Sequence, residues 1–144
     1  MSFPGHSFGD IAWAVAASVL IACASCTRHD SRVPVYPVRG LVLVGDKPAK
    51  NAFVVFHPEG AEGPQALRPY GHATADGSFK LTTFEADDGA PAGEYQVSVV
   101  WLADVGGEDP PDQLKGRYRN PQTSKLKATI KEQVNELTPF KLNR

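Results

Sequence analysis

The stretch EYQVSVVW, residues 94–101, decides the fold class that this 144-residue sequence predicts. Hydrophobic side chains occupy every second position of the stretch, namely Tyr95, Val97, Val99 and Trp101. The positions between them include the polar residues Gln96 and Ser98. A period of two is typical of a β-strand that buries one face and exposes the other. The sequence therefore predicts a half-buried strand at this point of the chain.

Six further segments carry strand patterns. The segment 77–84 alternates with Phe79 on the buried face, and the segment 126–130 alternates in the same way. The segments 38–44 and 52–57 are hydrophobic almost throughout, which is typical of central strands. The seven expected strands are 38–44, 52–57, 70–74, 77–84, 94–101, 126–130 and 137–142.

Turn residues separate these segments. Asp76-Gly77 stands between two strand patterns and predicts a two-residue hairpin turn in which both residues have positive φ. Pro139 cannot donate a backbone hydrogen bond, so the last strand is expected at a sheet edge or with a bulge. Helical periodicity is confined to the first hydrophobic segment of the chain. The expected fold is all-β, a seven-stranded antiparallel β-sandwich preceded by an amino-terminal signal helix.

The composition fits one small domain made of short elements. Hydrophobic residues make up 42%, which is enough for a core, and 13 Gly with 12 Pro indicate many turns. The formal net charge of -1 gives no reason to expect a nucleic-acid partner. Basic residues nevertheless gather late in the chain and form a candidate contact surface: Lys115, Arg117, Arg119, Lys125 and Lys127. A solvated surface is the plainer interpretation of the same charges.

The first hydrophobic segment is IAWAVAASVLIA, residues 11–22. As a helix it would span roughly 18 Å, whereas the hydrocarbon core of a bilayer is about 30 Å thick. Its length and its position match the hydrophobic region of a secretory signal peptide. Residues 1–10 contain Asp10 and no Lys or Arg, which departs from the positive charge typical of such signals.

The end of this segment, Leu20-Ile21-Ala22-Cys23, resembles the bacterial lipobox. The resemblance implies that a signal peptide of residues 1–22 is removed and that Cys23 becomes the lipidated first residue. A thiol is the nucleophile that accepts the diacylglyceryl group, and several acyl chains together anchor a protein durably. The expected location is the cell envelope, lipid-anchored to the membrane on its extracytoplasmic side, at the periplasmic or outer-membrane face.

Other interpretations of the two cysteines stay open. Cys26 also follows small residues and is an alternative lipid acceptor, whereas a Cys23–Cys26 disulfide would exclude a thioether on Cys23. A secreted form without lipid and a cytosolic protein with a buried core helix are further alternatives. Residues 23–37 are polar and contain Pro34 and Pro37, so they are expected to form an extended tether or, alternatively, an edge strand.

The order of turns and strands in residues 38–101 resembles the carboxypeptidase regulatory-like, transthyretin-like family of β-sandwiches. The matching residues, in chain order, are Gly45, Pro48 and Ala52, then Thr74, Asp76, Gly77 and Phe79, then Pro91, Gly93, Tyr95 and Val97. The resemblance implies that residues 38–144 form one domain of this family.

Residues 115–142 further resemble a class of small bacterial lipoproteins of this fold. The matching residues are Arg117, Tyr118, Pro121, Thr123, Ser124 and Leu126. We expect structural roles for these residues. Tyr118 should hold a long crossing loop against the sheets, and Thr123 and Ser124 should bond to nearby backbone.

Two enzyme families share this fold class, and neither motif is complete here. Hydroxyisourate hydrolases need a first-strand histidine and a Tyr-Arg-Gly-Ser terminus, which this sequence lacks. Intradiol dioxygenases hold iron with two Tyr and two His, and residues of these types are present without a supporting motif: His57, His72, Tyr70 and Tyr118. The acidic stretch 85–88 lacks the residue order of a calcium loop, so a solvated loop is the favoured interpretation. We expect no catalytic residue, no metal and no cofactor.

These observations predict a lipid-anchored module with a binding or structural role at the cell envelope. Its expected partners are the membrane, through the lipid, and an unidentified envelope protein or carbohydrate. The long loop 102–125, with the basic stretch 115–127, is the expected contact region. Two alternatives remain: a small hydrolase or metal-dependent enzyme that uses His57 and His72, and an accessory subunit of a larger exported enzyme.

Overall fold

The computed structural model describes residues 32–104 and 109–144. These residues form one short helix, α1 (Pro121–Ser124), and nine β-strands. The strands are β1 (Val38–Val44), β2 (Lys47–Pro48), β3 (Phe53–Pro58), β4 (Tyr70–His72), β5 (Ser78–Lys80), β6 (Gly93–Val100), β7 (Leu126–Ile130), β8 (Asn135–Glu136) and β9 (Phe140–Leu142). The predicted signal helix, the lipobox and most of the predicted tether lie outside the described residues.

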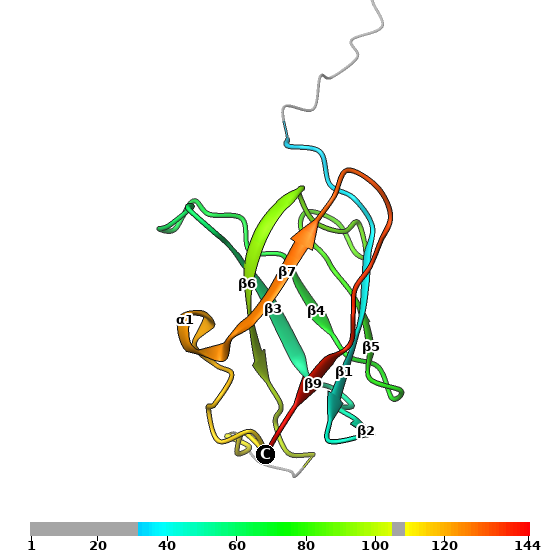
Figure 1. The fold of residues 1–144 in the computed structure, drawn as a ribbon, viewed down its shortest axis with the longest axis vertical. Helices are drawn as coiled ribbons and strands as arrows, with labels where there is room; N and C mark the ends of the chain where they lie inside the picture. The colour runs from blue at the N-terminus through cyan, green and yellow to red at the C-terminus, as the bar shows by residue number, and fades with distance from the viewer. Residues whose placement is uncertain (1–31, 105–108) are drawn as a thin grey trace, which may run out of the picture. The chain divides into compact units, whose positions relative to one another are not determined.

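The strands form two β-sheets (Figure 1). In the first sheet β1 is central, and β2 and β5 pair with one of its edges while β8 and β9 pair with the other. The second sheet has the order β4-β3-β6-β7. A domain of two β-sheets with almost no helix confirms the all-β prediction.

The hydrophobic core lies between the two sheets. The ring of Phe56 on β3 has its centroid 6.4 Å from that of Phe79 on β5 and 6.3 Å from that of Phe140 on β9. Phe79 and Phe140 stack on each other at 6.2 Å. The buried face predicted for β6 is confirmed for Tyr95, Val97 and Val99, but Ser98, which the alternation placed on the exposed face, is also buried. Burial of each large side chain of this kind contributes about 1.5–3 kcal/mol.

Seven of the nine strands lie within or beside segments where the sequence predicts strands. The other two, β2 and β8, are each two residues long, which is too short for a recognisable alternation. β2 forms as the chain returns along β1 after a tight turn, with Val44 opposite Lys47. β8 begins at Asn135, whose backbone N–H donates to the carbonyl oxygen of Pro37 at 2.8 Å.

The pairing of the last strands corrects the prediction of wholly antiparallel sheets. β8 and β9 run parallel to β1, with Val42 opposite Phe140. After β7 the chain crosses from one sheet to the other and then follows β1 in the same direction (Figure 1). Side chains alternate in both kinds of pairing, so the sequence pattern did not distinguish them. Pro139 lies between β8 and β9, and β9 is an edge strand among the described strands, as expected.

The turn between β4 and β5 also differs from the prediction. Gly77 has a φ of 82°, but Asp76 does not have a positive φ. The Gly77 N–H donates to the Thr74 carbonyl oxygen at 3.0 Å, and the Thr74 N–H donates to the Ser78 carbonyl oxygen at 2.8 Å. The connection is therefore a three-residue loop that ends in a left-handed glycine. The Asp76 carboxylate accepts hydrogen bonds from the hydroxyls of Thr74 and Ser78, both at 2.6 Å, and these bonds hold the loop in this form.

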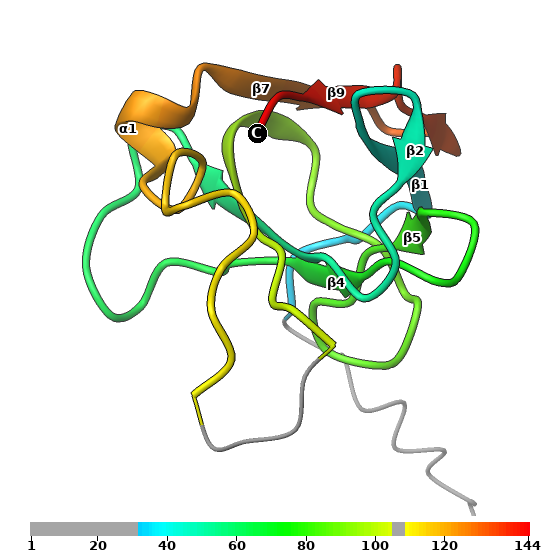
Figure 2. The ribbon, with the colours of Figure 1, turned by 90° about the horizontal axis from the view of Figure 1, so that it is seen from below.

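β4 and β5 lie side by side and join the two sheets along one side (Figure 2). The backbones of Tyr70 and Thr82 exchange two hydrogen bonds, of 3.0 and 2.8 Å. Gly71 permits this close approach, because a Cβ atom there would lie 2.4 Å from the carbonyl oxygen of Lys80. The two sheets thus form a rolled structure that is closed at β4 and β5.

The loop of residues 109–120 folds onto the end of β6 through one carboxylate. Asp112 accepts hydrogen bonds from the backbone N–H groups of Trp101, Leu114 and Gly116, at 3.2, 3.0 and 2.9 Å. Three backbone donors are satisfied in this way, which fixes the path of the loop.

Tyr118 and Ser124 have the structural roles expected of them. Tyr118 is buried, and its carbonyl oxygen accepts from the Val99 N–H at 2.9 Å. The Ser124 hydroxyl bonds to the nearby Pro121 carbonyl oxygen at 3.2 Å, as expected, and also to the distant Val97 carbonyl oxygen at 2.5 Å. The unpredicted helix α1 follows Tyr118 and ends at Ser124, and the side chain of Asn120 caps its amino end.

The first described residues are bonded to the sheets. Tyr36 exchanges two backbone hydrogen bonds with Ala90, of 2.9 and 3.0 Å. The end of the predicted tether therefore adds a short antiparallel contact to the domain. In residues 32–104 and 109–144, no helix has the length and hydrophobicity needed to cross a membrane.

Candidate functional site

A groove of about 670 Å³ runs across β1, β4 and β5, and we name it the β4–β5 groove. Its lining includes Arg39, Leu41, Tyr70, His72, Ser78, Lys80 and Asp87. Sites for small ligands commonly have volumes of about 300–1,000 Å³. The groove therefore has the size of a ligand site.

The floor of the groove consists of the neighbouring segments 70–74 and 78–82. Their backbones are hydrogen-bonded to each other at both ends, between Tyr70 and Thr82 and between Thr74 and Ser78. Because side chains alternate along an extended chain, every second one faces the groove. These side chains are Tyr70, His72, Thr74, Ser78, Lys80 and Thr82. Side chains on paired strands are positioned more rigidly than side chains on loops.

Tyr70 provides an aromatic wall. Its side chain is 41% exposed, and its ring centroid lies 5.9 Å from that of Phe53 and 6.5 Å from that of His72. The rings of Phe53 and His72 are 4.6 Å apart. The three rings support one another, so Tyr70 presents an exposed aromatic surface in a defined position.

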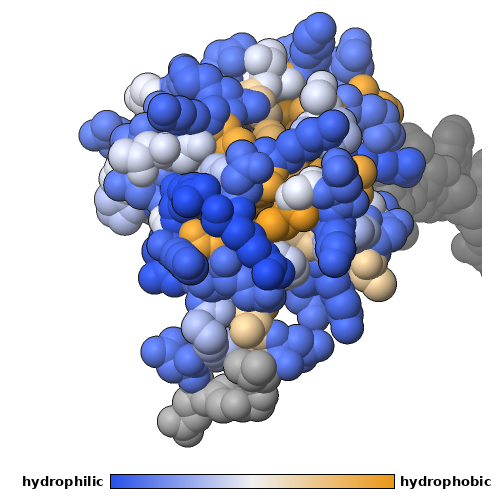
Figure 3. Space-filling model, turned by 60° about the horizontal axis from the view of Figure 1, so that its bottom comes forward, coloured by the Kyte–Doolittle hydropathy of each residue, from blue (hydrophilic) through white to orange (hydrophobic). Residues whose placement is uncertain are grey.

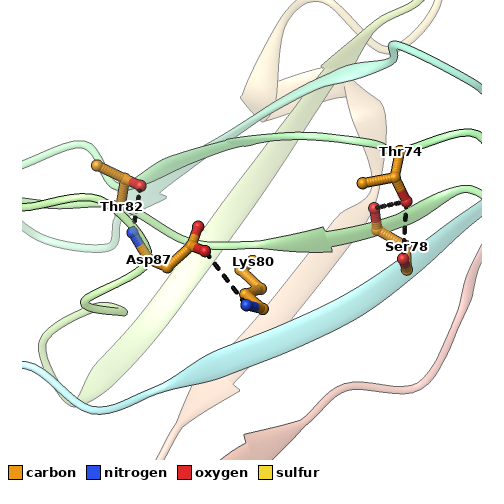
Figure 4. Close-up of polar contacts among 5 residues, drawn as sticks. All are labelled: Thr74, Ser78, Lys80, Thr82 and Asp87. Atoms are coloured by element: carbon orange, nitrogen blue, oxygen red, sulfur yellow. Dashed lines mark hydrogen bonds and ion pairs between the residues drawn. The ribbon is translucent and has the colours of Figure 1, made fainter.

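Two ion pairs lie at the groove. Lys80 Nζ is 3.2 Å from Asp87 Oδ2, and the Asp87 N–H donates to the Thr82 hydroxyl at 3.0 Å (Figure 4). Arg39 Nη1 is 3.8 Å from Glu136 Oε1. All four charged side chains are more than half exposed, so each pair contributes about 0–1 kcal/mol to stability. The two pairs matter more for the charge of the groove, because they line it with two positive and two negative side chains.

The other end of the groove carries two hydroxyl groups. The hydroxyl oxygens of Thr74 and Ser78 are 2.9 Å apart (Figure 4). Hydrogen bonds from Ser78, and then from Thr74, lower the pKa of Asp76 to about 2. The Asp76 carboxylate is therefore charged at neutral pH and holds both hydroxyl groups in place.

His57 lies in a second pocket, of about 530 Å³, together with Arg68 and Gln96. Its Nε2 atom is 2.9 Å from the hydroxyl oxygen of Ser98. Burial, and after it the charge of Arg68, lowers the pKa of His57, so the ring is neutral at pH 7. Ser98 is only 6% exposed, and the hydrogen bond satisfies its buried hydroxyl group.

The structure does not bring His57 and His72 together. His72 is paired with Phe53, and His57 lies four positions further along β3, roughly 13 Å away. Tyr70 lines the groove beside His72, whereas Tyr118 is buried in the core, so the four residues of the iron-ligand types do not form one site. The described part of the chain contains no group of three or more His, Cys, Asp or Glu residues that could hold a metal ion.

The acidic stretch 85–88 belongs to a loop that is held by hydrogen bonds between its own residues. One oxygen of Asp88 accepts from the N–H of Thr83 at 2.7 Å, and the other accepts from those of Phe84 and Glu85, both at 2.9 Å. Burial raises the pKa of Asp88, but these backbone donors together lower it. Both carboxylate oxygens are therefore engaged in holding the loop.

The predicted basic contact residues are all exposed: Lys115, Arg117, Arg119, Lys125 and Lys127. The first three lie on the loop 109–120, at the end of the domain that carries the carboxyl terminus (Figure 1). Lys127 lies on β7 and forms an ion pair of 2.9 Å with Glu59, which compensates its charge. Figure 3 shows this end of the molecule, where hydrophilic side chains cover most of the surface and hydrophobic surface appears between them.

The β4–β5 groove has no distinct signature in the sequence. A strand face with alternating polar side chains, such as that of Ser78 and Lys80, has the pattern of any solvated face. The sequence does contain one indication of the groove, the pair Tyr70 and His72. These two aromatic side chains occupy the exposed face of the short strand β4.

Comparisons with protein-family models, with curated proteins and with solved structures found no match.

Proposed function

We propose that this protein is a lipid-anchored, extracytoplasmic binding module of the cell envelope, and that the β4–β5 groove is its ligand site. Its domain is proposed to belong to the carboxypeptidase regulatory-like, transthyretin-like β-sandwiches. The module acts passively: the lipid sets its location and the groove sets what it binds. No bond is made or broken by the protein itself.

The observation that carries the binding role is the groove on β1, β4 and β5. Its volume of about 670 Å³ suits a small ligand, and its side chains stand on hydrogen-bonded strands. An exposed aromatic ring, Tyr70, lies beside polar groups, Lys80 and Ser78, on the same face. Such a combination of apolar surface with a few positioned polar groups is typical of binding sites.

The location rests on Leu20-Ile21-Ala22-Cys23. Acylation of Cys23 would add several hydrocarbon chains, and each buried CH₂ group contributes about 0.8 kcal/mol to membrane binding. Two or more chains together are enough for a durable anchor.

The experiment on the location is mass spectrometry of the mature amino terminus, combined with membrane fractionation. We expect the chain to begin at Cys23, with the mass of a diacylglyceryl group added, and to sediment with membranes. The Cys23→Ser variant should lose both the added mass and the membrane fraction. The matched control is Cys26→Ser, which should retain both. A protein with Met1 intact and an unmodified thiol at position 23 would contradict the proposal.

A further inference from the structure

The β4–β5 groove carries features that define a class of ligand, and the inference rests on the proposed function. The first feature is its aromatic wall. Among residues 32–104 and 109–144, the exposed large hydrophobic side chains are Val33, Leu67, Tyr70, Leu102 and Val134. The aromatic one, Tyr70, stands at the groove and is supported by Phe53 and His72. A fixed, exposed ring favours a ligand that has a flat apolar face of its own.

The second feature is the charge balance. Arg39 is paired with Glu136 at 3.8 Å, and Lys80 is paired with Asp87 at 3.2 Å. The opposite charges among the lining residues are equal in number, so the lining itself does not concentrate anions or cations. Asp76, which lies outside the lining, adds one negative charge at the Ser78 end, and this charge further disfavours anions. A charged group on a ligand would have to displace Glu136 from Arg39, or Asp87 from Lys80, or the reverse, before it could form an ion pair. The balance therefore favours a neutral ligand.

The third feature is the mixture of hydrogen-bonding groups on one face. The Lys80 ammonium has three N–H donors, and one of them is directed to Asp87. Asp87 supplies carboxylate oxygens, and the hydroxyl oxygen of Ser78 has lone pairs that accept further bonds. A hydroxyl group both donates and accepts, so a ligand rich in hydroxyl groups can use all three side chains.

We propose that the β4–β5 groove binds a neutral saccharide. The apolar face of one sugar ring stacks on Tyr70, and the hydroxyl groups of the saccharide bond to Lys80, Asp87 and Ser78. A sugar ring is the ligand that combines a flat apolar face, no net charge and many hydroxyl groups. The ion pairs remain intact and take part as polarised donors and acceptors.

Isothermal titration calorimetry of the full chain tests this proposal, with the protein purified in lauryldimethylamine oxide because sugar-based detergents would compete. The neutral saccharides are maltohexaose, cellohexaose and chitohexaose, and hexagalacturonate is the acidic saccharide of equal length. We expect at least one neutral hexasaccharide to bind and the acidic one to bind at least about tenfold more weakly. Preference for the acidic saccharide, or binding of none of the neutral ones, overturns the proposal.

Variants locate the binding. Tyr70→Ala should weaken binding of the neutral saccharide by about tenfold or more, because it removes the stacking surface. Tyr70→Phe, which keeps the ring, should bind within about threefold of the unchanged protein. Leu67→Ala is the matched control, because Leu67 is 38% exposed and lies outside the groove. Equal weakening by Leu67→Ala, or none by Tyr70→Ala, places the binding elsewhere and overturns the proposal.

The two proposals fail separately. A chain that is acylated at Cys23 but binds no neutral saccharide keeps the anchored location and loses the ligand class. A chain that binds the saccharide through Tyr70 but carries no lipid keeps the ligand class and loses the location.

Discussion

Gly89 lies at a point where two chain segments touch through their backbones. Its φ is 103°, and a Cβ atom there would lie 1.8 Å from the carbonyl oxygen of Tyr36. The neighbouring residue, Ala90, exchanges two backbone hydrogen bonds with the same Tyr36. A glycine satisfies both requirements, because it adopts a positive φ readily and leaves room for the carbonyl group.

Substitution of this glycine should separate the two segments. We expect Gly89→Ala to lower the free energy of unfolding by about 2–4 kcal/mol, from the steric clash and the unfavourable φ together. The control is Gly60→Ala, where φ is 79° but no atom lies within 4 Å of the added Cβ. That variant should lose about 1 kcal/mol. Urea unfolding measures both values, and equal losses would contradict the role of the close contact.

The sequence predicted burial well where alternation is regular, as for Tyr95 and Val97 in β6. The pattern predicts that a face is buried because the hydrophobic residues on it need a core. It does not predict which exposed polar residues gather into a groove, because Lys80 and Asp87 meet only through the path of a loop. The pair Asn120-Pro121, a cap followed by a favourable first helical residue, was a readable signal for α1.

At the scale of elements, the hairpin of β4 and β5 depends on the charge of one side chain. The Asp76 carboxylate accepts from the Ser78 backbone N–H at 2.9 Å, as well as from two hydroxyl groups. These bonds favour the charged form and lower the pKa of Asp76 to about 2. The stabilisation of the hairpin is therefore fully present above pH 4 and is lost as the pH falls through 2.

Asp76→Asn should remove this pH dependence. We expect a lower unfolding temperature than that of the unchanged protein at pH 7, because the charge that strengthens the bonds is gone. The difference between the two proteins should shrink as the pH falls from 4 to 2, since Asp76 itself becomes protonated there. Asp46→Asn, in the exposed turn after β1, is the control. Thermal unfolding followed by circular dichroism measures the differences, and a constant difference across this range would contradict the assignment.

The elements themselves were predictable to different degrees. Segments of five or more residues, such as β1 and β7, were located from their hydrophobic pattern alone. The direction of β9 could not be predicted from its pattern, because side chains alternate between the two faces in the same way in parallel and antiparallel pairs. The three-residue turn was missed because the two hydroxyl groups that hold Asp76 come from residues outside the Asp-Gly pair.

At the scale of the whole domain, the two ends of the roll differ in what they carry. The first described residues, 32–37, enter at one end, and the loop 109–120 lies at the other, beside the carboxyl terminus (Figure 1). The exposed side chains of Lys115, Arg117 and Arg119 are therefore at the end remote from residue 32. We call this end of the domain the basic end.

A partner at the basic end should depend on its charge. We expect the triple variant Lys115→Glu, Arg117→Glu and Arg119→Glu to reduce a cross-linked product in intact cells by about tenfold, with the membrane fraction unchanged. The control is Lys131→Glu, which changes a charge next to β7 and should leave the product in place. Identical cross-linking in the triple variant and the unchanged protein would remove the support for this contact surface.

The position of β1 determines how the domain responds to a force applied to the chain before it. This strand follows directly from residues 32–37, and it is hydrogen-bonded along both edges, to β2 and β5 on one and to β8 and β9 on the other. A force applied at its amino end acts along the strand, so the bonds on both edges are stretched together in shear. Shear of many bonds at once requires more force than opening them singly, as in unzipping. A pull on residues 32–37 would therefore load the hydrogen bonds on both edges of β1 together rather than one at a time.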